Sequence, residues 1–178
     1  MRGYSSTSKY LSLFLIISAA LFLKTAFCAQ SGLTEFQKQA RAYRDQGWRA
    51  QKQGDLDSAL AYYQKAVAVD PKYAVVYNDI GVILEAGGDL DGAIEVYLKA
   101  IDADPEYPGS YSNLALLYEE LGDYAHAVSC WVNRAILGGP QDPWAEVARR
   151  RLEEIARIYP EAYKSVGPQA IKNNSKQF

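Results

Sequence analysis

Cysteine, histidine and methionine are scarce in this chain. Its 178 residues include two cysteines, one histidine and one methionine. A zinc centre takes three or four ligands, mostly Cys and His, and the sequence offers too few of them. No phosphate-binding loop, nucleophile elbow or zinc motif occurs either. We therefore expect neither a metal nor another cofactor.

Long apolar runs are also lacking, with one exception at residues 11–23. Its thirteen residues fall short of the roughly 20 that a membrane helix needs. Arg2 and Lys9 precede it, and small residues around Cys28 offer a cleavage site. We expect residues 1–28 to be a signal peptide and the protein to be exported, either periplasmic or secreted. An uncleaved anchor and lipid attachment at Cys28 are the alternatives.

Clustered positive charge is missing as well. Removing residues 1–28 takes away three positive charges and no negative ones, so the formal net charge changes from −2 to −5. Nucleic-acid binding depends on grouped Lys and Arg, and we expect no nucleic-acid partner. Residues 74–107 carry eight acidic residues and one basic residue. This segment could steer a basic partner, or simply form a solubilising outer surface.

A period of 34 residues dominates the rest of the sequence. Shifting the chain by 34 aligns tyrosines, glycines, alanines and a second set of aromatic residues. The aligned positions are Tyr43, Tyr77 and Tyr111; Gly54, Gly88 and Gly122; Ala59, Ala93 and Ala127; and Tyr63, Tyr97 and Trp131. A fixed period of this length is typical of stacked supersecondary units.

Each unit is predicted to be a hairpin of two helices. In the middle unit, residues 77–84 have apolar side chains at three- and four-residue spacing, which favours an amphipathic helix. Gly88 ends it, because glycine adopts the left-handed conformation found at helix C-caps. A second apolar stripe occupies residues 93–101, and Asp89 or Asp91 can cap that helix.

At these positions the chain resembles the tetratricopeptide repeat family, whose repeat carries W-x2-L-G-x2-Y, then A-x3-F, then P. The matching residues of the middle unit are Tyr77, Ile80, Gly81, Leu84, Ala93, Tyr97 and Pro105. The resemblance covers residues 40–141. It implies an all-α solenoid of three helix hairpins, at residues 40–73, 74–107 and 108–141.

Further helical structure is predicted on both sides of the repeats. Thr34 opens a capping-box signature, so the first helix is expected to begin near Glu35, within an N-terminal extension at residues 29–39. After the repeats, Asp142 is followed by a proline, the combination that often begins a helix. We expect a capping helix at residues 142–160 and a flexible tail at residues 161–178.

The resemblance also implies a binding surface. In this family a concave groove is lined mainly by the first helix of each hairpin, and some members hold a partner's carboxylates there with Lys, Asn and Arg. The groove positions of this chain are Arg41, Arg44, Trp48, Val75, Asn78, Val82, Glu85, Ser112, Leu116, Glu119 and Glu120. Of these, Arg44 alone fits the carboxylate-binding pattern. We expect an exported scaffold or adaptor that binds a peptide or protein, with a membrane-associated complex as one setting, and no small-molecule substrate.

One pair of residues resembles a reactive site. His126 and Cys130 lie four positions apart on a predicted helix, so a thiol-based enzyme or enzyme accessory is the alternative function. No third residue is placed to orient the imidazole. Cys130 is more simply explained as a small apolar residue beside Trp131, and we expect no catalysis.

Overall fold

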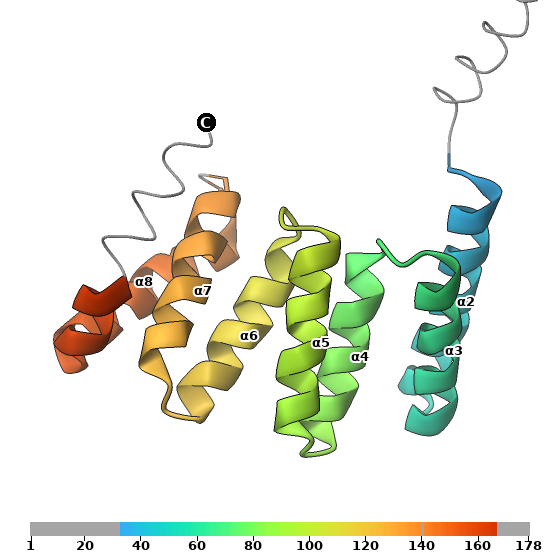
Figure 1. The fold of residues 1–178 in the computed structure, drawn as a ribbon, viewed down its shortest axis with the longest axis horizontal. Helices are drawn as coiled ribbons and strands as arrows, with labels where there is room; N and C mark the ends of the chain where they lie inside the picture. Colours follow the sequence, from blue (N-terminus) through green and yellow to red (C-terminus); the bar gives the residue numbers. More distant parts are fainter. Residues whose placement is uncertain (1–32, 140, 167–178) are drawn as a thin grey trace, which may run out of the picture. The chain divides into compact units, whose positions relative to one another are not determined.

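The computed structural model describes residues 33–139 and 141–166, and this part of the chain contains helices but no strand (Figure 1). The helices are α2 (Glu35–Lys52), α3 (Leu56–Val69), α4 (Ala74–Ala86), α5 (Leu90–Ala103), α6 (Pro108–Glu120), α7 (Tyr124–Leu137) and α8 (Pro143–Ile158). The predicted all-α class is confirmed. The expected signal peptide at residues 1–28 lies outside the described residues. Among those described, no helix combines the length and the apolar character that a membrane span requires.

The turns inside the three hairpins share one structure. Gly88 has φ +83°, a left-handed conformation that disfavours any residue with a Cβ atom. The next residue, Asp89, caps α5, because its carboxylate accepts a hydrogen bond of 3.0 Å from the backbone N–H of Gly92. This contact decides between the two predicted caps. The equivalent pairs in the other hairpins are Gly54 with Asp55 and Gly122 with Asp123.

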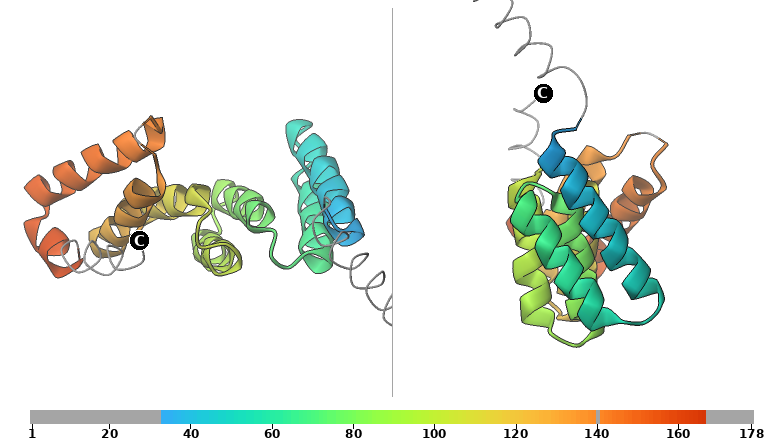
Figure 2. Two further views of the ribbon diagram at one scale, coloured as in Figure 1. Left: turned by 90° about the horizontal axis from the view of Figure 1, so that it is seen from above. Right: turned by 90° about the vertical axis from the view of Figure 1, so that its right-hand side faces the viewer.

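Helix packing in residues 39–166 is sequential. Each helix from α3 to α7 packs on the next one, and α4 also contacts α6, its counterpart in the following hairpin (Figure 2). One buried cluster joins α2, α3 and α4 around Tyr63. A second joins α5, α6, α7 and α8 around Trp131. The three hairpins and the helix after them confirm the predicted solenoid of repeats.

Small residues allow the two helices of a hairpin to approach closely. A Cβ atom built on Gly81 would lie 2.4 Å from Cε1 of Tyr97, a ring that is fully buried. Gly47 has the same relation to Tyr63, at 2.5 Å. The third hairpin has Ala115 at this position, opposite Trp131. Close contact at the hairpin crossing is therefore the reason for the small residue in each repeat.

Helix α8 begins and packs as predicted. The carboxylate of Asp142 caps it by accepting a hydrogen bond of 2.9 Å from the N–H of Trp144. Its buried residues are Ala145, Ala148 and Ile155, which lie on the side packed against α7. The helix thereby covers the apolar side of the last hairpin, as a capping helix does in a repeat protein.

The structure corrects the expectation of a flexible tail beginning at residue 161. Residues 160–166 are helical, and Tyr163 and Val166 pack against the second buried cluster. These two apolar residues are three positions apart and so share one helix face. Their packing against the cluster stabilises the helical conformation of an otherwise polar segment. Residues 167–178 lie outside the described part of the chain.

The capping box predicted before the repeats is present at the start of α2. The backbone N–H of Thr34 donates to Oε1 of Gln37 at 3.0 Å, and the N–H of Gln37 donates to Oγ1 of Thr34 at 3.2 Å. Two backbone donors of the first turn are satisfied reciprocally, which fixes the beginning of the helix at Glu35.

Candidate binding groove

The eleven predicted groove residues all lie on the first helices of the hairpins, α2, α4 and α6. Three of them are exposed apolar side chains at equivalent positions, 34 residues apart. Trp48 is 51% exposed, Val82 38% and Leu116 42%. Arg41 and Glu120 are also exposed, and Val75 is half-buried. The first helices therefore present an apolar residue in every repeat, with charged residues near the first and last of them.

Polar side-chain pairs join the first helices of successive hairpins. Some of the predicted groove residues are engaged in these pairs. Nε of Arg44 donates to Oδ2 of Asp79 at 2.7 Å, and Nδ2 of Asn113 donates to Oδ1 of Asn78 at 2.9 Å. Burial raises the pKa of the Asp79 carboxyl, and the guanidinium of Arg44 acts in the opposite direction. The positive charge of Arg44 is therefore already paired with a carboxylate of the protein itself. Asn78 is almost inaccessible to a partner, since only 8% of its surface is exposed.

A second set of polar contacts ties the end of each first helix to the buried aromatic residue of its own hairpin. The hydroxyl of Tyr97 donates to Oε2 of Glu85 at 2.7 Å, and the indole Nε1 of Trp131 donates to Oε1 of Glu119. In the first hairpin, the hydroxyl of Tyr63 donates to Oε1 of Gln51 at 2.8 Å. Glu85 and Glu119 therefore stabilise the hairpins, and partner binding is not their sole role.

Ser112 belongs to a buried contact between α6, α7 and the start of α8. Its Oγ accepts a hydrogen bond of 3.0 Å from Nε of Arg134, whose Nη2 donates to Oδ2 of Asp142 at 2.6 Å. This ion pair holds the pKa of the Asp142 carboxyl below its usual range. Arg134 is 4% exposed. It stands where the other repeats have alanine, and it connects the last hairpin to the capping helix.

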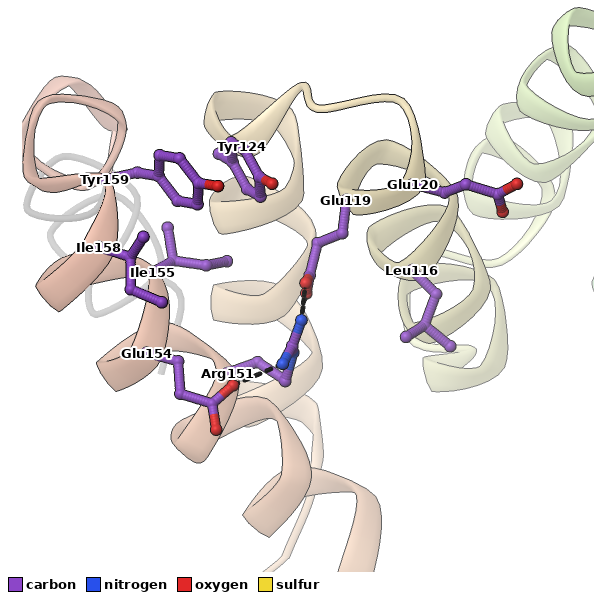
Figure 3. Close-up of a pocket in the computed structure, with 9 residues that line it drawn as sticks. All are labelled: Leu116, Glu119, Glu120, Tyr124, Arg151, Glu154, Ile155, Ile158 and Tyr159. Carbon is purple, nitrogen blue, oxygen red and sulfur yellow. Dashed lines mark hydrogen bonds and ion pairs between the residues drawn. The ribbon is translucent and has the colours of Figure 1, made fainter.

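A cavity of about 430 Å³ lies at the C-terminal end of α6 (Figure 3). It is lined by Leu116, Glu119, Glu120, Tyr124, Arg151, Glu154, Ile155, Ile158 and Tyr159. Three of these were predicted as groove residues. The other six come from α7, α8 and the residue after α8, and the sequence assigned none of them to the groove. The lining residues lie up to 43 positions apart in the chain. No local sequence pattern could therefore have indicated that these six residues line the same cavity as the end of α6.

Charged side chains inside this cavity are largely paired. Arg151 donates from Nε to Oε1 of Glu119 at 3.1 Å and from Nη1 to Oε2 of Glu154, and its Nη2 contacts Oε2 of Glu119. Hydrogen bonding to Glu119 raises the pKa of Arg151. The rings of Tyr124 and Tyr159 stack at 3.7 Å between centroids. In Figure 3, the carboxylate of Glu120 points away from Arg151.

The residues of the alternative thiol site do not form a nucleophile. Cys130 is buried, and burial raises the pKa of its thiol to about 12, whereas a thiolate nucleophile requires a lowered value. His126 is exposed, and its Nδ1 lies 2.7 Å from Oδ2 of Asp123. The expectation that no residue orients the imidazole is therefore wrong, because the aspartate that caps α7 does so. Residues 33–139 and 141–166 contain no group of three or more His, Cys, Asp or Glu side chains that could hold a metal ion.

Two sequence profiles described as tetratricopeptide repeat match the chain, one at residues 44–108 and the other at residues 96–128. Among proteins with curated functions, none matches.

Several solved structures are similar. The N-terminal domain of stress-induced protein-1 (STI-1) from C. elegans is 20% identical, with a TM-score of 0.57 over 66% of this chain and 98% of that domain. The Arabidopsis OM64 TPR domain is 21% identical, with a TM-score of 0.58 over 67% and 98%. The first TPR of Spaghetti (RPAP3), bound to the HSP90 peptide SRMEEVD, is 18% identical, with a TM-score of 0.59 over 67% and 98%. At these low sequence identities, the similarity shows only that this chain and the three domains share a fold.

Proposed function

This chain belongs to the tetratricopeptide repeat family, and from that premise we propose that it is a scaffold that binds a peptide or protein segment along α2, α4 and α6. The observation that carries the proposal is the exposure of Trp48, Val82 and Leu116 at equivalent positions. Aligned apolar side chains are a liability in water unless a partner covers them. One similar structure, that of Spaghetti, is a complex with a peptide, which supports a peptide as the type of partner.

The proposed contact surface is narrower than the set predicted from the sequence. It consists of the groove residues whose side chains are exposed, namely Arg41, Trp48, Val82, Leu116 and Glu120. Asn78 and Ser112 are nearly buried and engaged in hydrogen bonds within the protein. In this proposal they support the groove and make no contact with the partner.

The proposed scaffold acts after export and without catalysis. Export is supported by the basic residues and the apolar run within residues 1–28, and a complex at a membrane or in the periplasm is the proposed setting. The buried, protonated thiol of Cys130 supports a role without covalent chemistry. N-terminal sequencing of the protein from its native compartment tests export: a first residue at or near Ala29 is expected.

The groove is tested by truncating its apolar residues. Trp48→Ala and Leu116→Ala are each expected to weaken binding of a captured partner about thirty-fold, because anchors of this kind contribute about 2 kcal/mol or more. Helicity and melting temperature should stay nearly unchanged, since both side chains are exposed. Leu98→Ala is the matched control, because Leu98 is 48% exposed but lies on α5, a second helix.

One result would move the binding surface elsewhere. If a partner captured from the source organism still binds the Trp48 and Leu116 variants but is lost when Arg149 and Arg150 are changed, the partner binds α8. The groove proposal would then be abandoned.

A further inference from the structure

The cavity at the end of α6 combines exposed apolar walls with an aromatic pair. Leu116 is 42% exposed and Ile158 57%. The stacked rings of Tyr124 and Tyr159 lie on the same side of the cavity as Ile158 in Figure 3. At about 430 Å³ the space falls in the range of pockets that hold small ligands, about 300–1,000 Å³. It suits a few side chains of a peptide rather than a folded surface.

The charges of the cavity favour a cation. Its lining contains three glutamates and one arginine. Arg151, the one cation, is already engaged by Glu119 and Glu154, so an anionic ligand would have to displace a carboxylate. The carboxylate of Glu120 is exposed and makes no hydrogen bond or ion pair with the residues that the structure describes. It is available to an incoming positive charge.

The neighbouring repeat adds to this preference. Residues 74–107, which form α4 and α5, carry eight acidic residues and one basic residue, and α4 and α5 both contact α6. A negative potential next to a negatively lined cavity raises the local concentration of cationic segments and repels anionic ones.

From these observations we infer that the cavity binds a peptide segment in which a lysine or arginine lies next to a large apolar residue. The apolar residue contacts Leu116 and Ile158. The aliphatic stem of the basic residue lies along the apolar wall, and its charged end faces Glu120 or the ring faces of Tyr124 and Tyr159. This inference rests on the proposed function, because it names the chemistry of the segment that the groove binds.

The inference is tested with four fluorescein-labelled peptides and the full chain, by fluorescence anisotropy. The first peptide, amidated Lys-Leu-Phe-Lys-Leu-Lys, is the basic and apolar probe. In the second, glutamate replaces each lysine, and in the third, serine replaces Leu and Phe. The fourth is SRMEEVD. At 50 mM NaCl the first peptide is expected to bind at least tenfold more tightly than the others. Its advantage over the glutamate peptide should shrink at 0.5 M NaCl, since salt screens exposed charges.

Matched variants locate the binding site. Glu120→Gln should weaken binding of the basic probe about threefold, the effect of one exposed ion pair. Asp57→Asn should leave it unchanged, because Asp57 is also exposed but lies in the first turn of α3, outside both the cavity lining and the acidic residues of 74–107. Leu116→Ala and Ile158→Ala should each weaken it about fivefold or more, with the melting temperature unchanged.

Several results would overturn the inference. Equal binding of the glutamate or serine peptide, or equal effects of the Glu120 and Asp57 changes, would remove the basic and apolar preference. A synthetic peptide of residues 167–178 that binds in trans more tightly than the basic probe would make the chain's own segment the occupant. Self-association abolished by Ile158→Ala would make a second copy the occupant.

The inference and the proposed function fail separately. If the basic probe shows no preference while Trp48→Ala still weakens capture of a native partner, the inference falls and the scaffold proposal stands. If capture is insensitive to both Trp48 and Leu116, the scaffold proposal falls.

Discussion

Replacing Gly81 by alanine tests the close crossing of α4 and α5 in the middle hairpin. The new methyl group would lie 2.4 Å from Cε1 and 2.7 Å from Cδ1 of Tyr97, whereas carbon atoms in contact are about 3.5–4.0 Å apart. The ring has little room to move, because it is fully buried and its hydroxyl is hydrogen-bonded to Glu85. Overpacking of this kind costs about 1–3 kcal/mol. Because alanine favours the helix over glycine by about 1 kcal/mol, the free energy of unfolding should fall by about 1 kcal/mol in total.

Two neighbouring glycines provide the comparison. Gly87 has right-handed helical φ and ψ, and a Cβ atom there meets other atoms at an ordinary 3.4 Å, so Gly87→Ala should stabilise by about 0.4–1 kcal/mol. Gly88→Ala should destabilise by about 1–2 kcal/mol for a different reason, its φ of +83°, although nothing lies within 4 Å.

The assay is urea denaturation followed by circular dichroism, with melting temperature as a second measurement. Gly81→Ala and Gly87→Ala are expected to differ by about 2 kcal/mol, or roughly 4–8 °C in melting temperature for a chain of this size. If the Gly81 variant is as stable as the Gly87 variant, the two helices do not cross at Gly81 and the explanation of the small residue is wrong.

Three further predictions concern the core, the thiol and acid stability. Ala93→Leu should cost about 1–3 kcal/mol in the same assay, because Ala93 is fully buried and the larger side chain overpacks the core; an unchanged free energy of unfolding would show that the core around Ala93 has room for the larger side chain. Cys130 should resist iodoacetamide at pH 7.5 and react fully in denaturant, as mass spectrometry would show, because burial raises its pKa to about 12. Arg134 lowers the pKa of the Asp142 carboxyl in the folded protein. The ionised carboxylate therefore stabilises the fold fully above its pKa in the unfolded chain, about 3.9, and this stabilisation is lost as the pH falls through its lower pKa in the folded protein. Asp142→Asn should therefore flatten the decrease in unfolding free energy between pH 5 and pH 2, and an unaltered slope would exclude this carboxyl as a cause.

The helices and turns could be predicted because their signals are local. Gly88 and Asp89 determine where α4 ends and α5 begins through backbone conformation and a hydrogen bond three residues away. The exposure of Trp48, Val82 and Leu116 could likewise be anticipated, since equivalent positions of a repeat face the same way.

The cavity could not be predicted, because it depends on contacts between distant parts of the chain. Arg151 pairs with Glu119, 32 positions earlier, only because α8 packs across the last hairpin. The sequence offers three consecutive arginines on α8, and local spacing does not distinguish which one turns inward. The helical segment at residues 160–166 was missed for a related reason, since Tyr163 and Val166 gain their stability from a core formed by other helices.

The polar pairs between first helices bear on whether the repeats are interchangeable. Arg44 faces Asp79, and Asn78 faces Asn113, so the same contact has different chemistry at the two junctions. Excising residues 74–107 would preserve the 34-residue phase, but it would place Arg44 opposite Asn113, an amide without the charge that a partly buried guanidinium requires. Duplicating the same segment would instead place Asn78 opposite a second copy of Asp79. The three repeats therefore share one fold, but the polar residues at each junction match only when the repeats follow one another in the present order.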